Sequence, residues 1–291
     1  MFGVIDIGTN STRLLIASRS GRGITIEETG LITTRLGQGI GGCKLLDEAM
    51  ERTIKALHVF NKQAHGWGVN RIIAAATSAV RDAVNGPDFV KEVLRRTGLE
   101  IKVLTGSEEA AYSYRGVVGG LDSYPQQALV VDIGGGSTEF IWAVEGEIIF
   151  RSVQAGAVRM TEAMSSDEVM AGVLAPVLKE VGRSKLKNLV GVGGTVTTLG
   201  AMDRQLTVYD PALIHGHIVS LNRVDELLGM LQGCDLEARK QIPGLQAARA
   251  DIIIAGVKLV KIIMNRLQVP FLMISETDVL YGLALELASQ D

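Results

Sequence analysis

A short loop sequence occurs twice in this chain, and this repeat constrains the fold more than any other feature. The two copies are Asp6-Ile7-Gly8-Thr9-Asn10-Ser11-Thr12 and Asp132-Ile133-Gly134-Gly135-Gly136-Ser137-Thr138, which are identical at five of their seven positions. Each copy lies between two apolar runs, which is the pattern of a strand, a tight turn and a second strand. The sequence therefore predicts two related β-hairpins in two related halves of the chain.

The residues in both turns suit phosphate binding. Their small side chains leave backbone N–H groups and hydroxyls accessible to an anion. The candidate donors are Thr9, Asn10 and Ser11 in the first loop and Gly134, Gly135, Gly136 and Ser137 in the second. Each loop also begins with an aspartate, Asp6 or Asp132, and a carboxylate suits a hard cation such as Mg²⁺. We expect the two loops to hold one phosphorylated ligand from both sides.

The residue that directly follows each seven-residue copy also differs, and counts here as its eighth position. It is Arg13 after the first copy and Glu139 after the second. An arginine can bind a phosphate through two parallel hydrogen bonds. A glutamate can hold a metal ion or orient a water molecule. The sequence thus predicts that the first loop binds phosphate, whereas the second holds the metal ion and orients the attacking water.

Composition limits the class of protein. The chain has 291 residues, 47% of them hydrophobic, which is enough for two globular domains. Its net charge is 29 − 32 = −3, which argues against a broad nucleic-acid surface. The most apolar late segment, Ile252 to Met264, is too short for a membrane span and contains Lys258 and Lys261. The cysteines, Cys43 and Cys234, are far apart, so we expect reduced thiols in a cytoplasmic protein with neither a secretory signal nor a membrane partner.

Strand and helix patterns alternate along both halves of the chain. In the first half we expect strands near 2–6, 12–18, 23–30, 71–76 and 101–104, and helices near 45–65, near 87–96 and from 107. In the second half we expect strands near 128–133, 138–144, 147–153, 189–192 and 271–274, and helices after 195 and near 167–181, 222–232, 247–266 and 277–288. This order predicts an α/β protein with a mixed five-stranded sheet in each half.

A cluster of Gly, Asp and Pro residues at 119–125 marks the predicted domain boundary. We therefore expect an N-terminal domain of residues 1–121 and a C-terminal domain of residues 122–291. The pattern leaves open whether the last helix packs back on the first domain.

Three further polar segments are candidates for the site. Thr77, Ser78 and Arg81 follow a buried strand, and ligands bind at strand ends in α/β sheets. Gly193, Gly194 and Thr195 precede a helix, whose N-terminus can accept an anion. The pattern His215-Gly216-His217 suggests a metal site only weakly, because such histidines are more often structural.

These motifs together resemble one known family. The matching segments are Asp6 to Arg13, Ala75 to Ala83, Thr105-Gly106-Ser107-Glu108-Glu109-Ala110, Asp132 to Glu139, Gly156 to Arg159, Gly191 to Thr195 and Arg249 to Ile253. In this order and over nearly the whole chain, they resemble the exopolyphosphatase and guanosine pentaphosphate phosphohydrolase family. That family belongs to the actin-like fold shared by sugar kinases and the Hsp70 ATPase. The chain resembles the short members, which lack extra helical C-terminal domains.

The resemblance also implies roles for particular residues. It implies that Glu109 is the general base that takes a proton from water, with Glu108 as the alternative carboxylate. It implies that Asp132 and Glu139 hold Mg²⁺, which Mn²⁺ could replace, or orient the water. Asp6, at the equivalent position of the first loop, is a further candidate metal ligand. The resemblance further implies a ligand cleft between two actin-like domains, and a homodimer.

The expected activity is release of terminal orthophosphate from inorganic polyphosphate by in-line attack of water. The alternative within the same class is a guanosine pentaphosphate 5′-phosphohydrolase, because both substrates end in a phosphoanhydride. A kinase of the same fold is a weaker alternative, since the Glu-Glu-Ala segment suits water rather than an acceptor pocket. A non-catalytic sensor of these polyphosphates is weaker still, because both the base and the metal carboxylates are present.

Overall fold

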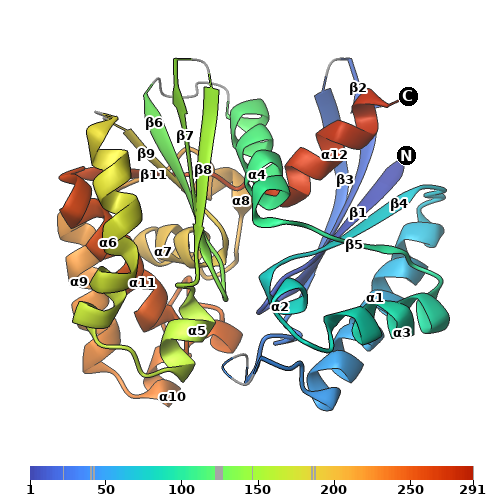
Figure 1. Ribbon diagram of the computed structural model, residues 1–291, viewed down its shortest axis with the longest axis horizontal. Coiled ribbons are helices and arrows are strands. Elements are labelled where there is room, and N and C mark those ends of the chain that lie inside the picture. The colour runs from blue at the N-terminus through green and yellow to red at the C-terminus, as the bar shows by residue number, and fades with distance from the viewer. Residues whose placement is uncertain are drawn as a thin grey trace. The chain divides into compact units, whose positions relative to one another are not determined.

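The structure is a computed structural model that describes residues 1–290 except 22, 40, 42, 122–126, 146, 185 and 187. Contacts between residues divide the chain into two compact units (Figure 1). Unit 1 contains Met1–Gly120 together with the C-terminal segment Asp278–Asp291, and unit 2 contains Leu121–Thr277. The segment proposed as a boundary from sequence includes residues 122–125, which lie outside the described residues.

Unit 1 is built on a mixed sheet, which has five strands in the described part of the chain, in the order β3-β2-β1-β4-β5. The strands are β1 (Phe2–Ile7), β2 (Thr12–Ser20), β3 (Gly23–Ile32), β4 (Ile72–Ala76) and β5 (Ile101–Val103). The first three run antiparallel, and β4 and β5 run parallel to β1. All five agree with the strands expected from the sequence to within a few residues.

Both faces of this sheet are covered, which explains why β1 is buried along its length. Its helices are α1 (Asp47–Gly66), α2 (Ser78–Arg81), α3 (Gly86–Thr97), α4 (Gly106–Gly120) and α12 (Val279–Ser289). Ile5 and Ile7 of β1 join a core with α1 and α3, whereas Phe2 and Val4 join a second core with α12. The alternation follows from the two-residue period of a strand. The last helix, whose packing the sequence left open, thus covers one face of the unit 1 sheet.

Helices α4 and α12 pack against each other at two glycines, and they lie side by side in Figure 1. A Cβ atom on Gly116 would lie 2.0 Å from the carbonyl oxygen of Asp278. A Cβ atom on Gly282 would lie 1.9 Å from the carbonyl oxygen of Tyr112. Neither position can accept a side chain unless the helix backbones move apart, so these glycines fix how closely α12 approaches α4.

We therefore expect Gly282→Ala to destabilise the protein by about 2–3 kcal/mol, because overpacking against a backbone carbonyl cannot relax through side-chain rotation. The matched control is Gly229→Ala, since Gly229 lies in a helix and a Cβ there would meet nothing within 4 Å. That control is expected to stabilise the protein by about 0.5–1 kcal/mol through helix propensity. Urea denaturation compares the two variants, and equal midpoints would show that α4 and α12 are not closely fitted.

Unit 2 contains a mixed sheet with the order β10-β11-β9-β6-β7-β8 in the described part of the chain. The strands are β6 (Ala128–Ile133), β7 (Thr138–Val144), β8 (Glu147–Val153), β9 (Asn188–Val192), β10 (Ile218–Ser220) and β11 (Phe271–Ile274). The expectation of five strands is wrong for this unit, because β10 adds an antiparallel edge strand beside β11. Three residues are too few to show an alternating pattern, so this strand cannot be predicted from its sequence.

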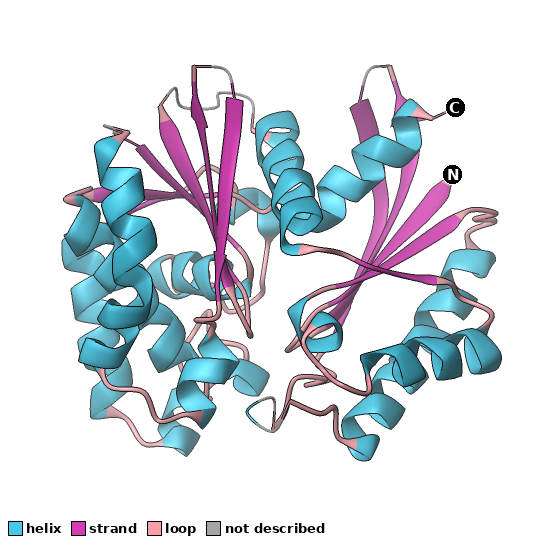
Figure 2. Cartoon of the chain, in the orientation of Figure 1, coloured by secondary structure: helices cyan, strands magenta, loops and turns pink. Residues whose placement is uncertain are grey.

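The helices of unit 2 build most of its core. They are α5 (Ala157–Glu162), α6 (Asp167–Arg183), α7 (Gly194–Asp203), α8 (Pro211–Ile214), α9 (Leu221–Gly233), α10 (Leu236–Arg239), the 3₁₀ helix Ala247–Arg249 and α11 (Ile253–Leu267). Figure 2 shows the helices α6, α9 and α11 grouped beside the strands. The expected helix at 247–266 is in fact the 3₁₀ helix followed by α11. No helix in the described ranges is both long and apolar enough to cross a membrane.

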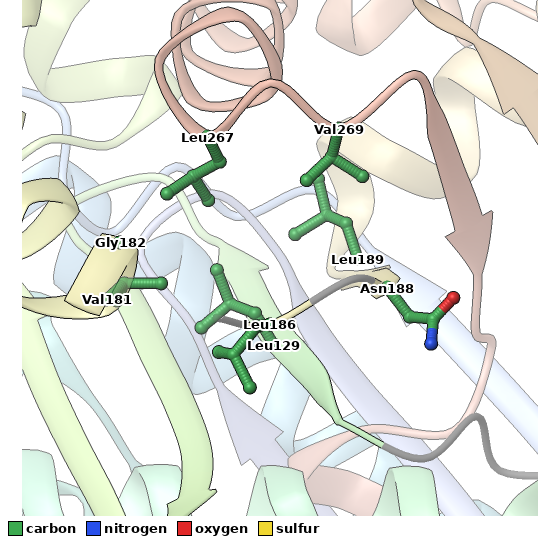
Figure 3. A pocket seen from close by; sticks show the side chains of 8 residues that line it. All are labelled: Leu129, Val181, Gly182, Leu186, Asn188, Leu189, Leu267 and Val269. Carbon is green, nitrogen blue, oxygen red and sulfur yellow. The ribbon is translucent and has the colours of Figure 1, made fainter. Parts of the chain in front are cut away.

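A small pocket lies at the amino-terminal end of strands β6 and β9 (Figure 3). Its volume is about 60 Å³, and Leu129, Leu189, Leu267 and Val269 are among the residues that line it. Ligands in sheets of this kind bind instead at the carboxyl ends of parallel strands. The position of this pocket argues against a ligand site, and it favours the carboxyl ends of β6 and β9 instead.

Candidate active site

The two repeated loops have the same construction in the structure. Each joins two antiparallel strands, β1 to β2 and β6 to β7, as the sequence predicts. In the first loop the N–H of Gly8 donates to the carbonyl of Ser11 at 3.0 Å. In the second loop the N–H of Gly134 donates to the carbonyl of Ser137 at 3.1 Å. The shared sequence therefore encodes a shared hairpin geometry.

The segment that follows β3 holds the first loop by its carbonyl groups. Gly37 N–H donates to the Thr9 carbonyl at 2.8 Å, and Arg35 N–H donates to the Asn10 carbonyl at 2.9 Å. In a trans peptide unit the N–H points opposite the carbonyl. The N–H groups of Asn10 and Ser11 consequently point away from this segment, in the orientation that an anion site needs.

Helix α5 holds the second loop in the same way. Ala157 N–H donates to the Gly134 carbonyl at 3.0 Å, and Val158 N–H donates to the Gly135 carbonyl at 2.9 Å. The Arg159 Nε donates to the Gly136 carbonyl at 2.8 Å, so this arginine supports the loop backbone. The N–H groups that follow these carbonyls in the chain point away from α5.

The polar residues after β1 and β4 meet because the two strands are parallel neighbours. Thr77 N–H donates to the carbonyl of Ile7 at 3.4 Å, which joins the two strand ends. The hydroxyls of Thr9 and Ser78 lie 3.0 Å apart in a buried hydrogen bond. The structure thus brings together two segments that the sequence analysis assigned to phosphate binding, although phosphate binding itself stays a prediction.

Glu109 and Arg81 form a partly buried ion pair in unit 1. Glu109 lies in the first turn of α4 and is 7% exposed. Its Oε2 accepts a hydrogen bond from Arg81 Nη1 at 2.7 Å, and the same nitrogen donates to the Leu104 carbonyl at 3.1 Å. Arg81 therefore fixes the orientation of the Glu109 carboxylate.

The neighbouring Glu108 has a different environment. Its carboxylate accepts from Thr105 N–H at 3.0 Å, while its own N–H donates to the Thr105 hydroxyl at 3.2 Å. This reciprocal pair is a capping box, which stabilises the start of a helix. Lys102 Nζ also lies 2.9 Å from Glu108, and hydrogen bonds from Lys102 and Thr105 lower the pKa of Glu108. The spacing Thr105-x-x-Glu108 is a sequence signal for this role, and it leaves Glu109 as the better candidate base.

Asp6 and Arg13 pair directly across the β1–β2 hairpin. The Arg13 Nη2 lies 2.7 Å from Asp6 Oδ2, and Arg13 Nη1 lies 2.6 Å from Asp278 Oδ2. Burial raises the pKa of Asp6, and Arg13 opposes that shift. Arg13 was expected to bind phosphate, and that role stays a prediction, but its guanidinium is held here between two carboxylates.

In the second hairpin the equivalent register pair is Asp132 and Glu139. Both residues are buried, with 8% and 1% of their surface exposed. Residues directly opposite across antiparallel strands have Cβ atoms about 4.5–5.5 Å apart. Ionised carboxylates on two such neighbouring residues repel each other, so a cation between them would stabilise the pair.

This pair suits Mg²⁺ in particular. Within the described ranges, no group of three or more His, Cys, Asp or Glu side chains could hold a metal. Mg²⁺ typically takes one or two carboxylates and completes its octahedron with waters and substrate phosphates. Asp132 and Glu139 match this preference. In unit 1, Asp6 Oδ1 is a buried carboxylate oxygen that has no hydrogen-bond partner in the described part of the chain. When bound, the ion would neutralise charge on the substrate phosphates.

The loop after β9 approaches Asp132 so closely that only glycine fits. Gly193 has a φ of +85°, and a Cβ atom there would lie 2.6 Å from Asp132 Oδ1. A Cβ atom on Gly194 would lie 1.6 Å from Arg249 Nη1. Arg249 therefore lies against the amino end of α7, where it adds a positive charge beside the predicted anion site.

Residues 15–290 match the model of the Ppx/GppA phosphatase family. The chain belongs to that family. It is 35% identical to exopolyphosphatase 2 of Mycobacterium tuberculosis, with 98% of this chain and 97% of that protein covered. It is also 34% identical to a bifunctional 3-dehydroquinate synthase/phosphatase of Fusobacterium nucleatum, over 97% of this chain. The chain spans 46% of the length of that bifunctional protein.

A solved structure of an exopolyphosphatase from Cytophaga hutchinsonii matches this chain with a TM-score of 0.91 at 25% identity. The match covers 99% of this chain and 98% of that one. The two α/β units therefore have the actin-like fold of Ppx/GppA proteins, as the resemblance implied.

Sequence reasoning missed one residue near the carboxylate pair of this Ppx/GppA protein. Ser152 of β8 is the register partner of Glu139, and its hydroxyl donates to Glu139 Oε1 at 2.7 Å. The interaction holds the glutamate on the face that it shares with Asp132. The only sequence signal was the register of the β7–β8 hairpin, which places residues 139 and 152 opposite each other.

The two histidines of the His-x-His pattern have separate partners in this Ppx/GppA chain. His215 Nδ1 accepts from the N–H of Glu276 at 3.1 Å. His217 Nε2 lies 2.7 Å from Asp203, which also binds Arg223. These contacts support the structural interpretation that the sequence analysis favoured over a metal site.

Proposed function

We propose that this protein is an exopolyphosphatase that removes terminal orthophosphate from inorganic polyphosphate. The observation that carries the proposal is the buried register pair Asp132 and Glu139. The pair flanks the loop from Gly134 to Ser137, whose N–H groups point away from α5. This arrangement supports a cation and a phosphate held at one loop. Membership of the Ppx/GppA phosphatase family and the similarity to an exopolyphosphatase support the same reaction class.

In this proposal Glu109 accepts a proton from a water molecule, and the water oxygen attacks the terminal phosphorus. The bond from that phosphorus to its bridging oxygen breaks, which releases orthophosphate and leaves a polyphosphate shorter by one unit. Arg81 keeps the Glu109 carboxylate oriented through the 2.7 Å ion pair. Catalysis of this kind depends mainly on positioning and charge neutralisation.

The loop residues would bind the oxygens of the terminal phosphates. The candidate donors are Thr9, Asn10 and Ser11 in the loop of unit 1, and Gly134 to Ser137 in the loop of unit 2. The N–H groups at the amino end of α7 would bind phosphate as well. They belong to Gly193, Gly194 and Thr195, and Arg249 lies beside them. Mg²⁺ held by Asp132 and Glu139 would supply the positive charge that these neutral donors lack.

The test is release of orthophosphate from polyphosphate, guanosine pentaphosphate and ATP, measured side by side with Mg²⁺. The proposal expects polyphosphate to give the highest kcat/KM. A higher value for guanosine pentaphosphate would replace it with the alternative phosphohydrolase. Phosphate transfer to an acceptor from ATP, without hydrolysis of polyphosphate, would identify a kinase instead.

A further inference from the structure

Asp278 is a buried carboxylate to which the proposed reaction assigns no role. It is 4% exposed and immediately precedes α12. Its Oδ1 accepts from the N–H of Leu280 at 3.0 Å, which caps the helix. Its Oδ2 accepts from Arg13 Nη1 at 2.6 Å. One side chain therefore joins the last helix of the chain to the hairpin of the first loop.

Close helix packing keeps Asp278 in this place. Gly116 of α4 faces the carbonyl of Asp278 so closely that its Cβ would lie 2.0 Å away. The backbone of Asp278 cannot move toward α4, and its side chain is held at both oxygens. The contact with Arg13 is thus set by the packing of α12 and not by a flexible surface side chain.

Arg13 in turn donates hydrogen bonds to one carboxylate oxygen of Asp6. The Arg13 Nε and Nη2 both donate to Asp6 Oδ2, at 3.0 and 2.7 Å. The other oxygen, Asp6 Oδ1, is buried and has no hydrogen-bond partner among the described residues. A buried carboxylate oxygen without a donor is costly unless a cation or a water reaches it.

The charges of the three side chains favour a cation over an anion. Asp6 and Asp278 contribute two negative charges when ionised, and Arg13 contributes one positive charge. An arginine side chain stays charged in proteins, and the guanidinium of Arg13 is bound by both carboxylates. With both carboxylates ionised, the cluster carries one net negative charge.

We propose that Asp278 is a positioning residue of the active site: it fixes Arg13 over Asp6 Oδ2, so that Asp6 presents Oδ1 to a divalent cation. The inference rests on the proposed Mg²⁺-assisted hydrolysis and adds a residue that acts on it from the C-terminal helix. In this inference Arg13 orients the carboxylate of Asp6 and does not bind phosphate directly. Asp278 itself touches neither substrate nor metal in this arrangement.

Asp278→Asn tests the proposal, because asparagine still caps a helix but carries no charge. The loss of one nearby negative charge is expected to raise the Mg²⁺ concentration for half-maximal activity about tenfold. The partly released Arg13 is expected to strengthen inhibition by orthophosphate several-fold, by roughly the effect of one charge-assisted contact. A residue that only caps α12 would change neither value.

Two comparisons separate positioning from capping. Asp235→Asn is the matched control, since Asp235 caps α10 through Ala238 N–H at 2.9 Å on an exposed surface. It is expected to leave both values unchanged. In the Arg13→Gln background, Asp278→Asn is expected to add almost no further effect, because Asp278 acts through Arg13.

A binding readout separates this inference from the proposed function. The Mg²⁺-induced rise in melting temperature is measured in a Glu139→Gln background, which weakens the site in unit 2. We expect Asp278→Asn to reduce the rise that remains. If it does so while wild type releases no phosphate, the inference holds and the proposed function fails. If wild type is active and Asp278→Asn matches Asp235→Asn in every readout, the inference is overturned and the function stands.

Discussion

Glu109→Gln is expected to lower the turnover number by about 10²–10⁴-fold, the usual effect of losing a general base. Glutamine keeps the size of the side chain and can still accept the hydrogen bond from Arg81, which lies 2.7 Å away. The protein should therefore remain folded and still bind polyphosphate, and only the proton acceptor is lost. Phosphate release at saturating substrate measures the turnover number, and filter retention of labelled polyphosphate measures binding.

Glu108→Gln is the matched control, because it changes the adjacent residue in the same way. The structure gives Glu108 a capping-box contact with Thr105 and an ion pair with Lys102. We expect this variant to lose about 0.5–1 kcal/mol of stability and to keep nearly normal turnover. An inactive Glu108→Gln together with an active Glu109→Gln would show that the base is the other carboxylate.

The second large effect is expected at the carboxylate pair, where Asp132→Asn and Glu139→Gln should each lower activity at least about 10²-fold through the loss of a metal ligand. Both changes also remove one charge from a buried pair of like charges. In EDTA the variants are therefore expected to be at least as stable as wild type, because the repulsion is relieved. Loss of activity without loss of stability would mark the pair as functional.

Mg²⁺ provides the corresponding test on the unmodified protein. Chelation with EDTA should abolish hydrolysis reversibly. Saturating Mg²⁺ should stabilise wild type, by about 2.7 kcal/mol at 100 times the dissociation constant. Thermal denaturation with and without Mg²⁺ measures this difference, which should shrink in both variants. Full activity in excess EDTA would rule out the metal-assisted reaction.

The hairpins were predictable because their geometry is local. A tight turn between two apolar strands fixes the register, and the register places the first and eighth residues of each repeat opposite each other. Asp6 faces Arg13 and Asp132 faces Glu139 for this reason. The capping box at Thr105 and Glu108 is equally local, so the sequence could have separated Glu108 from Glu109, although the family resemblance alone left both open.

Other features depend on residues that are distant in the chain. Arg13 meets Asp278 only because α12 returns to unit 1 and packs at Gly116 and Gly282. No pattern near Arg13 in the sequence predicts a carboxylate partner 265 positions away. In the same way, Arg249 reaches Gly194, and Ser78 reaches Thr9, through the packing of elements that are far apart in the sequence.

The sequence by itself determined the two loops, their strands, the family and the chemical types at the site. These features follow from patterns of a few residues, in which turn chemistry and alternation leave few options. Only the tertiary structure decided which charges meet, because buried ion pairs depend on how helices pack on the sheet. That packing places Arg13 between Asp6 and Asp278, whereas its binding of phosphate stays a prediction.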